Sequence, residues 1–589
     1  MPAETPWYRS RGLPLIVLAA AVAAAPVALH GPFCGDDFQF HLISWLDAQQ
    51  SWRHGIPYPH WAPSPNYGAG EPRFIFYPPL TWMLGAALGF VLPWGWVPVA
   101  MAFLLLSATG LATFALARRL LAEAPATFAA VTTILSVWVL FTTYERAAFA
   151  ELAGGFWIPL LLLVLCDNAP SATVWRGVFG GSALPLALVV AGAWLSNAPV
   201  GVMTSYLLAG VALGSAWLSR SWFPALRAAI AGVLGIALAA VYIIPAAYEQ
   251  RWVDILEATG ASGEPGLKIE NNWLFGVSAD PAMKAHNAEL RFVSVLVTVM
   301  IAVAILSAIA VWIRRRVAPA ARSSWIILTC IPIAVLFLQL PISLPLWNLL
   351  PKLRFLQFPW RWLLVVEAPM AILLAAAVWP GGSAKRLQRA LVPIVCGIFL
   401  LASFSFATRT FFRACIPAEH LPALLATYRS GAGFWGAYEY APPGADNSLT
   451  PSGLPDACLI ASLNDGLGVA PTPNADPVWR PKQGTCVTTA TATVRTPEHM
   501  HIVATVPQAG FLVLRLHRFP AWRITVNGSP VNDLPLRSDG LLAISVPGGT
   551  VNVDADWTTT PDVLAGRGVT SAAIVLMGML WIRARKKSG

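Results

Sequence analysis

The chain has 589 residues, of which 56% are hydrophobic and only 12% are charged, and its mean hydropathy is +0.61. Soluble proteins carry charge on about a quarter of their residues, so this composition excludes an ordinary soluble protein. The formal net charge is +10, but the basic residues lie at the ends of apolar segments, as the positive-inside rule describes for membrane proteins. The charge therefore indicates membrane topology, and we expect no nucleic-acid partner.

The first apolar segment, residues 13–29, follows Arg9 and Arg11. The small residues near its end could serve a signal peptidase. Pro26 within the segment, and the stretch rich in reactive side chains directly after it, favour a retained membrane anchor instead. We therefore expect this segment to span the membrane with the N-terminus in the cytoplasm.

The stretch after this anchor, residues 34–80, is dense in acidic, basic and aromatic side chains. Asp37 and His41 are four residues apart, so they share one face of a helix that leaves the membrane. A carboxylate at the edge of a low-dielectric cavity can act as a general base, which makes Asp37 a catalytic candidate and Asp36 a second one. Capping of the helix N-terminus is the alternative for both aspartates, and for Asp36 it is the better interpretation.

The apolar segment at residues 79–92 decides the topology of every later span. Because it is short for a membrane-spanning helix, we predict a re-entrant or interfacial helix. The later basic clusters then all fall on the cytoplasmic face, and about twelve spans leave both termini in the cytoplasm. After the anchor, the predicted spans are residues 96–117, 125–143, 155–167, 178–196, 199–218, 227–246, 292–313, 324–345, 362–380, 391–408 and 562–582.

Two of the predicted external loops carry charged residues close to membrane depth, where such residues are usually functional. Glu145 and Arg146 could also form an interfacial pair, whereas Glu151 is followed by small residues that leave room for a ligand. Arg361 lies among aromatic residues, so its guanidinium could bind a phosphate while the aromatic rings hold a lipid. Anchoring of the loop at the membrane interface explains Arg361 equally well.

A polar segment, residues 409–561, precedes the final span and the basic tail at residues 562–589. Residues 487–557 have the alternation and β-branched content of strands. Asn527-Gly528 predicts a tight hairpin turn, because such a turn needs positive φ at both central residues. We therefore predict an external β-sandwich-like domain tethered by the last span.

Four cysteines fall in the predicted external segments, which allows three disulfide pairings. We prefer a bond between Cys458 and Cys486, because both belong to the polar domain. Cys34 and Cys415 are the other two. Residues 441–482, which surround Cys458, are rich in Pro, Gly, Asn and Asp, and we predict loop for them.

Several short motifs resemble those of known membrane proteins. Asp37-Phe-Gln-Phe-His41 and Gly55-Ile-Pro-Tyr-Pro-His-Trp61 resemble the first external loop of bacterial GT-C-type membrane glycosyltransferase relatives. More narrowly, the chain resembles the 6-pyruvoyl-tetrahydropterin-synthase-related and YfhO-like membrane proteins. Further similar motifs are Tyr67-Gly-Ala-Gly, Phe76-Tyr-Pro-Pro-Leu80, Arg146-Ala-Ala-Phe-Ala-Glu151, Gln357-Phe-Pro-Trp-Arg361, Phe519-Pro-Ala-Trp-Arg-Ile-Thr-Val-Asn-Gly528 and Val546-Pro-Gly-Gly549.

The resemblance implies a GT-C-like transmembrane module over residues 1–408, with a catalytic first external loop at residues 31–95. In this module an acidic residue of the first loop serves as catalytic base or metal ligand. Carried onto this sequence, the base is Asp37 and the second acid is Glu151, and both are candidate ligands for a divalent cation, Mg²⁺ or Mn²⁺. The residues expected to contact the substrate are His41, Trp61, Tyr77, Arg146 and Arg361.

The function implied by the resemblance is inverting transfer of a sugar from a polyprenyl-phosphate donor. The acceptor would be an extracytoplasmic envelope glycan, lipid or protein, and the enzyme would lie in a bacterial inner or plasma membrane. The name tetrahydropterin implies no pterin chemistry here, because the sequence has no histidine cluster for it. The alternatives are a transporter or flippase of lipid-linked precursors and a non-catalytic scaffold for envelope assembly. A flippase predicts charged residues deep within spans, whereas nearly all of those here lie at span ends.

Overall fold

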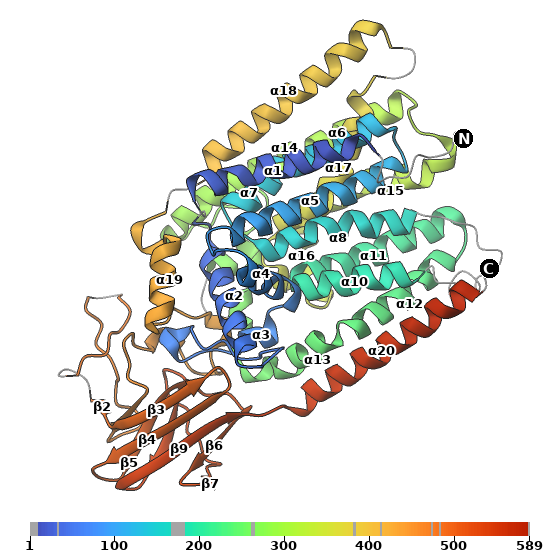
Figure 1. The fold of residues 1–589 in the computed structure, drawn as a ribbon. Helices are drawn as coiled ribbons and strands as arrows, with labels where there is room; N and C mark the ends of the chain where they lie inside the picture. The colour runs from blue at the N-terminus through green and yellow to red at the C-terminus, as the bar shows by residue number, and fades with distance from the viewer. Residues whose placement is uncertain are drawn as a thin grey trace.

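A bundle of long helices carries an antiparallel β domain at one end (Figure 1). The structure is a computed structural model that describes residues 10–31, 34–166, 183–260, 265–380, 384–412, 415–472, 475–481 and 485–586. The first helix starts, and the last helix ends, at the end of the bundle away from the β domain. This arrangement agrees with the prediction that both termini share one side of the membrane.

The bundle is built from apolar helices of very different lengths. They are α1 (Gly12–His30), α5 (Val97–Arg118), α6 (Glu123–Ile134), α7 (Val137–Tyr144), α8 (Phe149–Cys166), α10 (Leu184–Ser196), α11 (Ala198–Ser219), α12 (Phe223–Leu238), α13 (Ala240–Glu249), α14 (Lys284–Ile313), α15 (Arg322–Leu338), α16 (Leu344–Leu349), α17 (Leu363–Val378), α18 (Arg386–Phe411) and α20 (Pro561–Lys586). Helices of the predicted external loops are α2 (Phe38–Arg53), α3 (Arg73–Phe76), α4 (Pro79–Val91) and α19 (Leu421–Ser430).

The number of membrane spans can be compared directly with these helices. In the described ranges, nine helices are long and apolar enough to cross a membrane, with α6 and α7 counted together. The count rises to eleven if the bent pairs α12–α13 (74°) and α15–α16 (94°) each form one span. The predicted span 178–196 corresponds to α10, which is shorter at 13 residues, while residues 178–182 lie outside the described residues. The polytopic helical fold is confirmed, and twelve spans stay a prediction.

The segment that decides the topology forms α4, a helix of 13 residues. At a rise of 1.5 Å per residue it is about 20 Å long, which is less than the roughly 30 Å hydrocarbon core of a bilayer. It packs against α2, α5 and α10. Its length therefore fits an interfacial or half-inserted helix, and its position in the membrane stays a prediction.

The β domain contains two antiparallel sheets, as predicted for the C-terminal part of the chain. The first has the strand order β2-β1-β5-β8 and the second the order β3-β4-β9-β6-β7. Asn527 and Gly528, at φ of 50° and 79°, form the predicted turn between β6 and β7. The strands are β1 (Ala457–Ile460), β2 (Val487–Thr488), β3 (Ala490–Thr496), β4 (His499–Val506), β5 (Gly510–His517), β6 (Trp522–Val526), β7 (Ser529–Pro530), β8 (Leu541–Val546) and β9 (Gly549–Trp557).

One strand lies where the sequence predicted only loop. β1 occupies four residues within 441–482 and pairs with β5 and β2. All four of its residues are buried, because the strand lies inside the sheet between two partners. A fully buried strand of this length shows no polar alternation, and this is why the loop prediction was wrong at this point.

Two disulfides join segments of the predicted external side. Cys458 is bonded to Cys486, the preferred pairing, and Cys34 is bonded to Cys415. The second bond ties the start of the first external loop to the segment that follows α18. Disulfides persist in oxidising compartments, so both bonds support an extracytoplasmic location for these segments.

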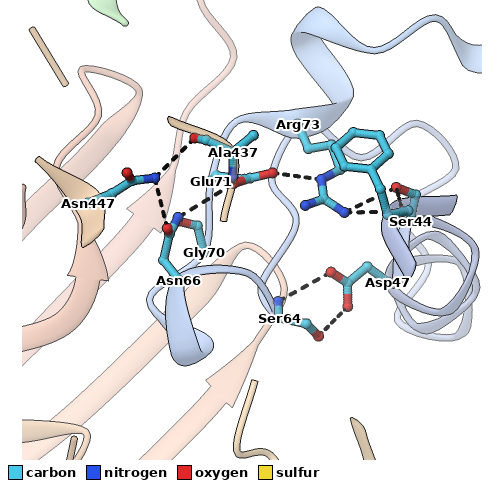
Figure 2. Close-up of polar contacts among 10 residues, drawn as sticks. Ser44, Asp47, Ser64, Asn66, Gly70, Glu71, Arg73, Ala437 and Asn447 are labelled. Atoms are coloured by element: carbon cyan, nitrogen blue, oxygen red, sulfur yellow. Dashed lines mark hydrogen bonds and ion pairs between the residues drawn. The ribbon is translucent and has the colours of Figure 1, made fainter. Parts of the chain in front are cut away.

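A buried ion pair holds the first external loop to the segment that precedes the β domain (Figure 2). Arg73 Nε donates to Glu71 Oε1 at 2.6 Å, and the two side chains are 2% and 0% exposed. Arg73 also donates to Ser44 Oγ and to the carbonyl of Phe40 in α2, at 3.2 and 3.3 Å. Glu71 Oε2 accepts from the backbone N–H of Ala437 at 3.0 Å. The pair therefore links α2, the loop after it and a segment more than 360 residues away.

Two further sets of hydrogen bonds extend this network (Figure 2). Asn447 Nδ2 donates to Asn66 Oδ1 and to the carbonyl of Ala437, both at 3.0 Å. Asp47 of α2 accepts from the backbone N–H and the hydroxyl of Ser64, at 3.2 and 2.6 Å. Burial raises the pKa of Asp47 to about 6, although the bonds from Ser64 act in the opposite direction. The loop between α2 and α3 is thus fixed at several points.

We expect Glu71→Gln to destabilise the protein strongly, because the buried guanidinium of Arg73 would lose the carboxylate to which it is directly hydrogen-bonded. Breaking such a pair typically costs about 3–5 kcal/mol. Glu270→Gln is the matched control, since Glu270 pairs with Arg354 at 2.8 Å but is 46% exposed, and exposed pairs contribute at most about 1 kcal/mol. Thermal unfolding of the two variants in detergent measures the difference. Equal midpoints would contradict this account of the network.

Candidate functional site

The start of the first external loop lies against the loop between α7 and α8. The backbone N–H of Asp37 donates to the carbonyl of Arg146 at 2.9 Å, and that of Asp36 donates to the carbonyl of Glu145 at 3.3 Å. Asp37 occupies the N-cap position of α2, but its side chain makes no capping hydrogen bond. The Asp37 carboxylate therefore stays available, at 47% exposed, beside the second external loop.

Four of the predicted charged residues meet at this point. Arg146 donates to Glu151 Oε2 at 2.8 Å and lies 3.9 Å from Asp37 Oδ2. Arg361 Nε lies 3.6 Å from the same oxygen of Glu151. The side chains of Arg146 and Glu151 are 9% and 5% exposed, and that of Arg361 is 14% exposed. The site thus holds two guanidinium groups around one buried carboxylate, with Asp37 at its open side.

Two buried polar atoms of this cluster make no hydrogen bond with the described residues. Glu151 Oε1 and Arg361 Nε are buried and have no hydrogen-bond partner among the described residues. Arg361 is held through Nη1, which donates to the carbonyl of Leu356 at 3.1 Å. Buried groups of this kind usually have partners, so the arrangement is suited to receive a polar ligand.

Aromatic rings hold the two arginines in place. The Arg146 guanidinium lies 5.1 Å from the centre of the Trp360 ring, and that of Arg361 lies 5.2 Å from the centre of the Phe358 ring. The two rings stack on each other at 4.7 Å. These cation–π contacts restrict the motion of both guanidinium groups and leave their positive charge unpaired by the rings.

His41 and Tyr77 form a neutral wall beside the charged cluster. His41 Nδ1 and the Tyr77 hydroxyl are 3.4 Å apart. Burial, then the charges of Arg73 and Arg146, lower the pKa of His41 to about 3, so this imidazole is uncharged at neutral pH. Burial, then the charge of Asp37, raise the pKa of Tyr77 well above its ordinary value. His41 and Tyr77 therefore keep polar atoms near Asp37 without adding charge.

Trp61 lies apart from the cluster, inside the contact between the first loop and the β domain. It is 1% exposed, and its ring lies 5.4, 5.6 and 6.1 Å from the rings of Trp522, Trp557 and Phe519. Its place in a buried aromatic cluster leaves no exposed face for a substrate. The substrate contact expected of Trp61 stays a prediction, and its packing position in this cluster is one that the first-loop sequence alone did not indicate.

An apolar groove is lined in part by the residue that follows Arg361 in the chain. It is a cavity of about 460 Å³ among α11, α15 and α17, and Trp362, which follows Arg361 directly, belongs to its lining. Along α11 the lining runs from Tyr206 to Leu218, a distance of about 18 Å at the rise of an α-helix. The groove was not visible in the sequence, because its walls come from three helices that are apolar on every side.

A divalent cation does not fit the arrangement of the two candidate acidic ligands. The described residues contain no group of three or more His, Cys, Asp or Glu that could hold a metal ion. Glu151 is already shared by the guanidinium groups of Arg146 and Arg361. A cation between Asp37 and Glu151 would lie beside both of these positive charges. We therefore derive no step through a metal ion.

The sequence was compared with protein families, with curated proteins and with solved structures. Residues 74–411, more than half of the chain, match the family described as 6-pyruvoyl-tetrahydropterin synthase related domain, membrane protein. No curated protein matches the sequence.

Three similar solved structures have low sequence identity to this chain. An oligosaccharyltransferase, AglB from Archaeoglobus fulgidus, in complex with an inhibitory peptide and a dolichol-phosphate, has 12% identity and a TM-score of 0.43 over 72% of this chain and 60% of that chain. The Archaeoglobus fulgidus oligosaccharyltransferase tethered with an acceptor peptide has 10% identity and a TM-score of 0.40, covering 74% and 61%. Arabinofuranosyltransferase AftD from Mycobacteria has 17% identity and a TM-score of 0.41, covering 94% and 42%. The chain thus spans less than two thirds of the length of each.

We expect Gly35→Ala to separate the first loop from the second and to destabilise the protein. A Cβ at Gly35 would lie 2.7 Å from the backbone nitrogen of Ala147, so the backbone would have to move. Overpacking of this kind typically costs about 1–3 kcal/mol. Gly95→Ala is the matched control, because a Cβ at Gly95 meets nothing within 4 Å. Thermal unfolding measures the effect, and an unchanged midpoint in Gly35→Ala would show that the close approach is not required.

Proposed function

We propose, from the premise that this chain belongs to the 6-pyruvoyl-tetrahydropterin-synthase-related membrane proteins, that it is a membrane glycosyltransferase. Its donor is a polyprenyl-phosphate sugar and its acceptor is an extracytoplasmic molecule of the cell envelope. The observation that carries the proposal is the meeting of Asp37, Arg146, Glu151 and Arg361 beside an apolar groove. A carboxylate, two cations and a lipid-sized groove are the parts that this reaction needs.

The two arginines and the groove support a lipid-linked phosphate as the donor. Guanidinium groups bind phosphate through paired, charge-assisted hydrogen bonds. Arg361 Nε has no hydrogen-bond partner among the described residues, and the next residue along the chain, Trp362, lines the groove. A phosphate bound by Arg361 and Arg146 would therefore have an apolar channel of about 18 Å beside it for the prenyl chain. Glu151 acts as a positioning residue that holds both guanidinium groups.

Asp37 is the proposed general base. Its carboxylate takes the proton of an acceptor hydroxyl, and the hydroxyl oxygen attacks the anomeric carbon from the side opposite to the phosphate. A new glycosidic C–O bond forms as the bond between the anomeric carbon and the phosphate oxygen breaks, which inverts the configuration. The electron pair leaves with the polyprenyl phosphate, whose charge Arg146 and Arg361 stabilise. A phosphate leaving group needs little proton donation, so one carboxylate suffices.

The proposed location places this site at the outer surface of a bacterial inner or plasma membrane. The β domain and the first loop lie at one end of the bundle, and the start of α1 and the end of α20 lie at the other (Figure 1). Basic residues such as Arg118 lie near this second end, because Glu123, which follows α5 closely, accepts hydrogen bonds from Ser10 and Gly12 at the start of α1. The positive-inside rule then assigns the second end to the cytoplasm.

We expect Asp37→Asn to lower turnover by about 100- to 10,000-fold, the range typical for loss of a general base. Arg361→Gln should mainly raise the KM for the donor, because it removes a phosphate contact. Asp533→Asn, a change of an exposed aspartate in the β domain, is the control and should leave turnover unchanged. The assay follows consumption of a panel of undecaprenyl-phosphate sugars by the purified protein. Normal turnover in Asp37→Asn would refute the base, and no consumption by the unmodified protein would count against the function.

The orientation is tested by cysteine labelling from outside intact cells. His54 follows α2, Arg315 follows α14, and both side chains are exposed. A membrane-impermeant maleimide should label His54→Cys in intact cells and Arg315→Cys only after the cells are opened. The reverse pattern would place the proposed active site in the cytoplasm.

A further inference from the structure

A second cavity lies at the end of α2 opposite to Asp37. Its volume is about 690 Å³, and it lies between the end of α2, helix α19 and the strands β3 and β5. Because α2 has 16 residues, its two ends are about 24 Å apart. The cavity is therefore separate from the Asp37 site, and its size is that of a pocket for a ligand of several rings.

The cavity is lined by positive charge. Its lining includes Arg53, Arg429, Arg495 and Arg515, and no Asp or Glu is found among the described residues that line it. Arg515 and Arg495 share a single carboxylate, Asp456, at 2.8 and 3.8 Å. Arg53 and Arg429 are exposed. The guanidinium groups thus outnumber their nearby counter-charge.

Several polar groups of this cavity are left without partners. Arg515 Nε and Gln49 Nε2 are buried and have no hydrogen-bond partner among the described residues. Burial, then the charge of Arg515, lower the pKa of Arg495 to about 10. Burial and the neighbouring charge of Arg515 thus disfavour the charged form of Arg495, although Asp456 and Asp47 act in the opposite direction. An anion in the cavity would favour the charged form and complete the missing hydrogen bonds.

The rest of the lining suits a sugar better than an acyl chain. Trp94 and Tyr428 present aromatic rings, and Gln50 and Ser64 present an amide and a hydroxyl. Pockets for polar ligands combine apolar faces with a few placed polar groups in this way. By contrast, the groove beside Arg361 is almost wholly apolar, as a lipid tail requires. The two cavities therefore differ in the chemistry that they can accept.

We propose that the cavity between α2, α19 and the β domain binds an acidic saccharide, one that carries carboxylate or phosphate groups. Arg53, Arg429, Arg495 and Arg515 bind the anionic groups, and Trp94 and Tyr428 pack on the sugar rings. One part of this inference rests on the proposed function: if the protein is a glycosyltransferase, the bound saccharide is its acceptor.

Binding is measured with full-length protein in nanodiscs of neutral lipid. The probes are a hexamer of galacturonic acid, a phosphorylated maltohexaose and, as the neutral control, maltohexaose. We expect one or both acidic probes to bind and the neutral probe to bind at least about tenfold more weakly. The acidic probes separate carboxylate from phosphate recognition. A comparison in nanodiscs with anionic lipid shows whether headgroups occupy the cavity instead.

The variants separate recognition from folding. Arg53→Gln with Arg429→Gln changes two exposed side chains and should weaken acidic-probe binding at least about tenfold, without lowering the unfolding midpoint. Arg515→Gln should weaken binding further. Arg523→Gln, a change of an exposed arginine on β6, is the matched control and should bind normally.

Three results would overturn the inference. They are equal binding of acidic and neutral probes, unchanged binding in the double variant, and loss of acidic-probe binding only when anionic lipid is present. Asp37→Asn should still bind the acidic probe. If that variant binds but the unmodified protein consumes no donor, the proposed function fails while the acidic-saccharide site stands.

Discussion

The buried pair between Glu71 and Arg73 is the constraint on which the placement of both sites depends. Two residues that are only two positions apart are turned toward each other and away from water, and their remaining atoms bind α2 and Ala437. Removing two charges from water offsets most of their attraction, so such a pair contributes little net stability. The pair instead restricts the first loop to one position, because any other position would leave a buried charge without its partner.

A fixed first loop makes α2 a rigid spacer between two cationic regions. Its N-terminal end presents Asp37 to Arg146, and its C-terminal end carries Arg53 into the second cavity. The Cys34–Cys415 bond holds one end of this loop, and the aromatic contacts of Trp61 hold the loop to the β domain. The β domain therefore belongs to the architecture of the site, since it supplies both a wall of the second cavity and an anchor for the loop.

The sequence predicted the proposed catalytic cluster better than it predicted the cluster's surroundings. Asp37, Glu151 and Arg361 stand out because each is a charged residue at the end of an apolar segment, and alternating spans bring alternate ends together. The same reasoning could not find the Glu71 network, because its partners Asn66 and Asn447 are ordinary loop residues until the fold joins them.

The sequence also could not predict which residues of the β strands would line a cavity. Arg495 and Arg515 are typical of solvated strand faces, and only the docking of the β domain against α2 encloses them. The packing position of Trp61 was missed for the related reason that an aromatic residue in an external loop is equally suited to a ligand or to a domain contact. The four-residue strand β1 was missed because burial on both faces removes the alternation that marks a strand.

Charge balance connects the proposed donor site with the proposed saccharide site. In the first, Arg146 and Arg361 share Glu151, and in the second, Arg515 and Arg495 share Asp456. In the first region Asp37 also lies 3.9 Å from Arg146, so two carboxylates face two guanidinium groups. The second region also contains Arg53 and Arg429, and it therefore keeps a surplus of positive charge. A further carboxylate supplied by the protein would remove that surplus and would compete with a ligand for the same hydrogen bonds. The shortage of acid around the second cavity is therefore what makes it complementary to an anion from outside the chain. In the first region the complementary feature is instead the buried Arg361 Nε, which lacks a hydrogen-bond partner among the described residues.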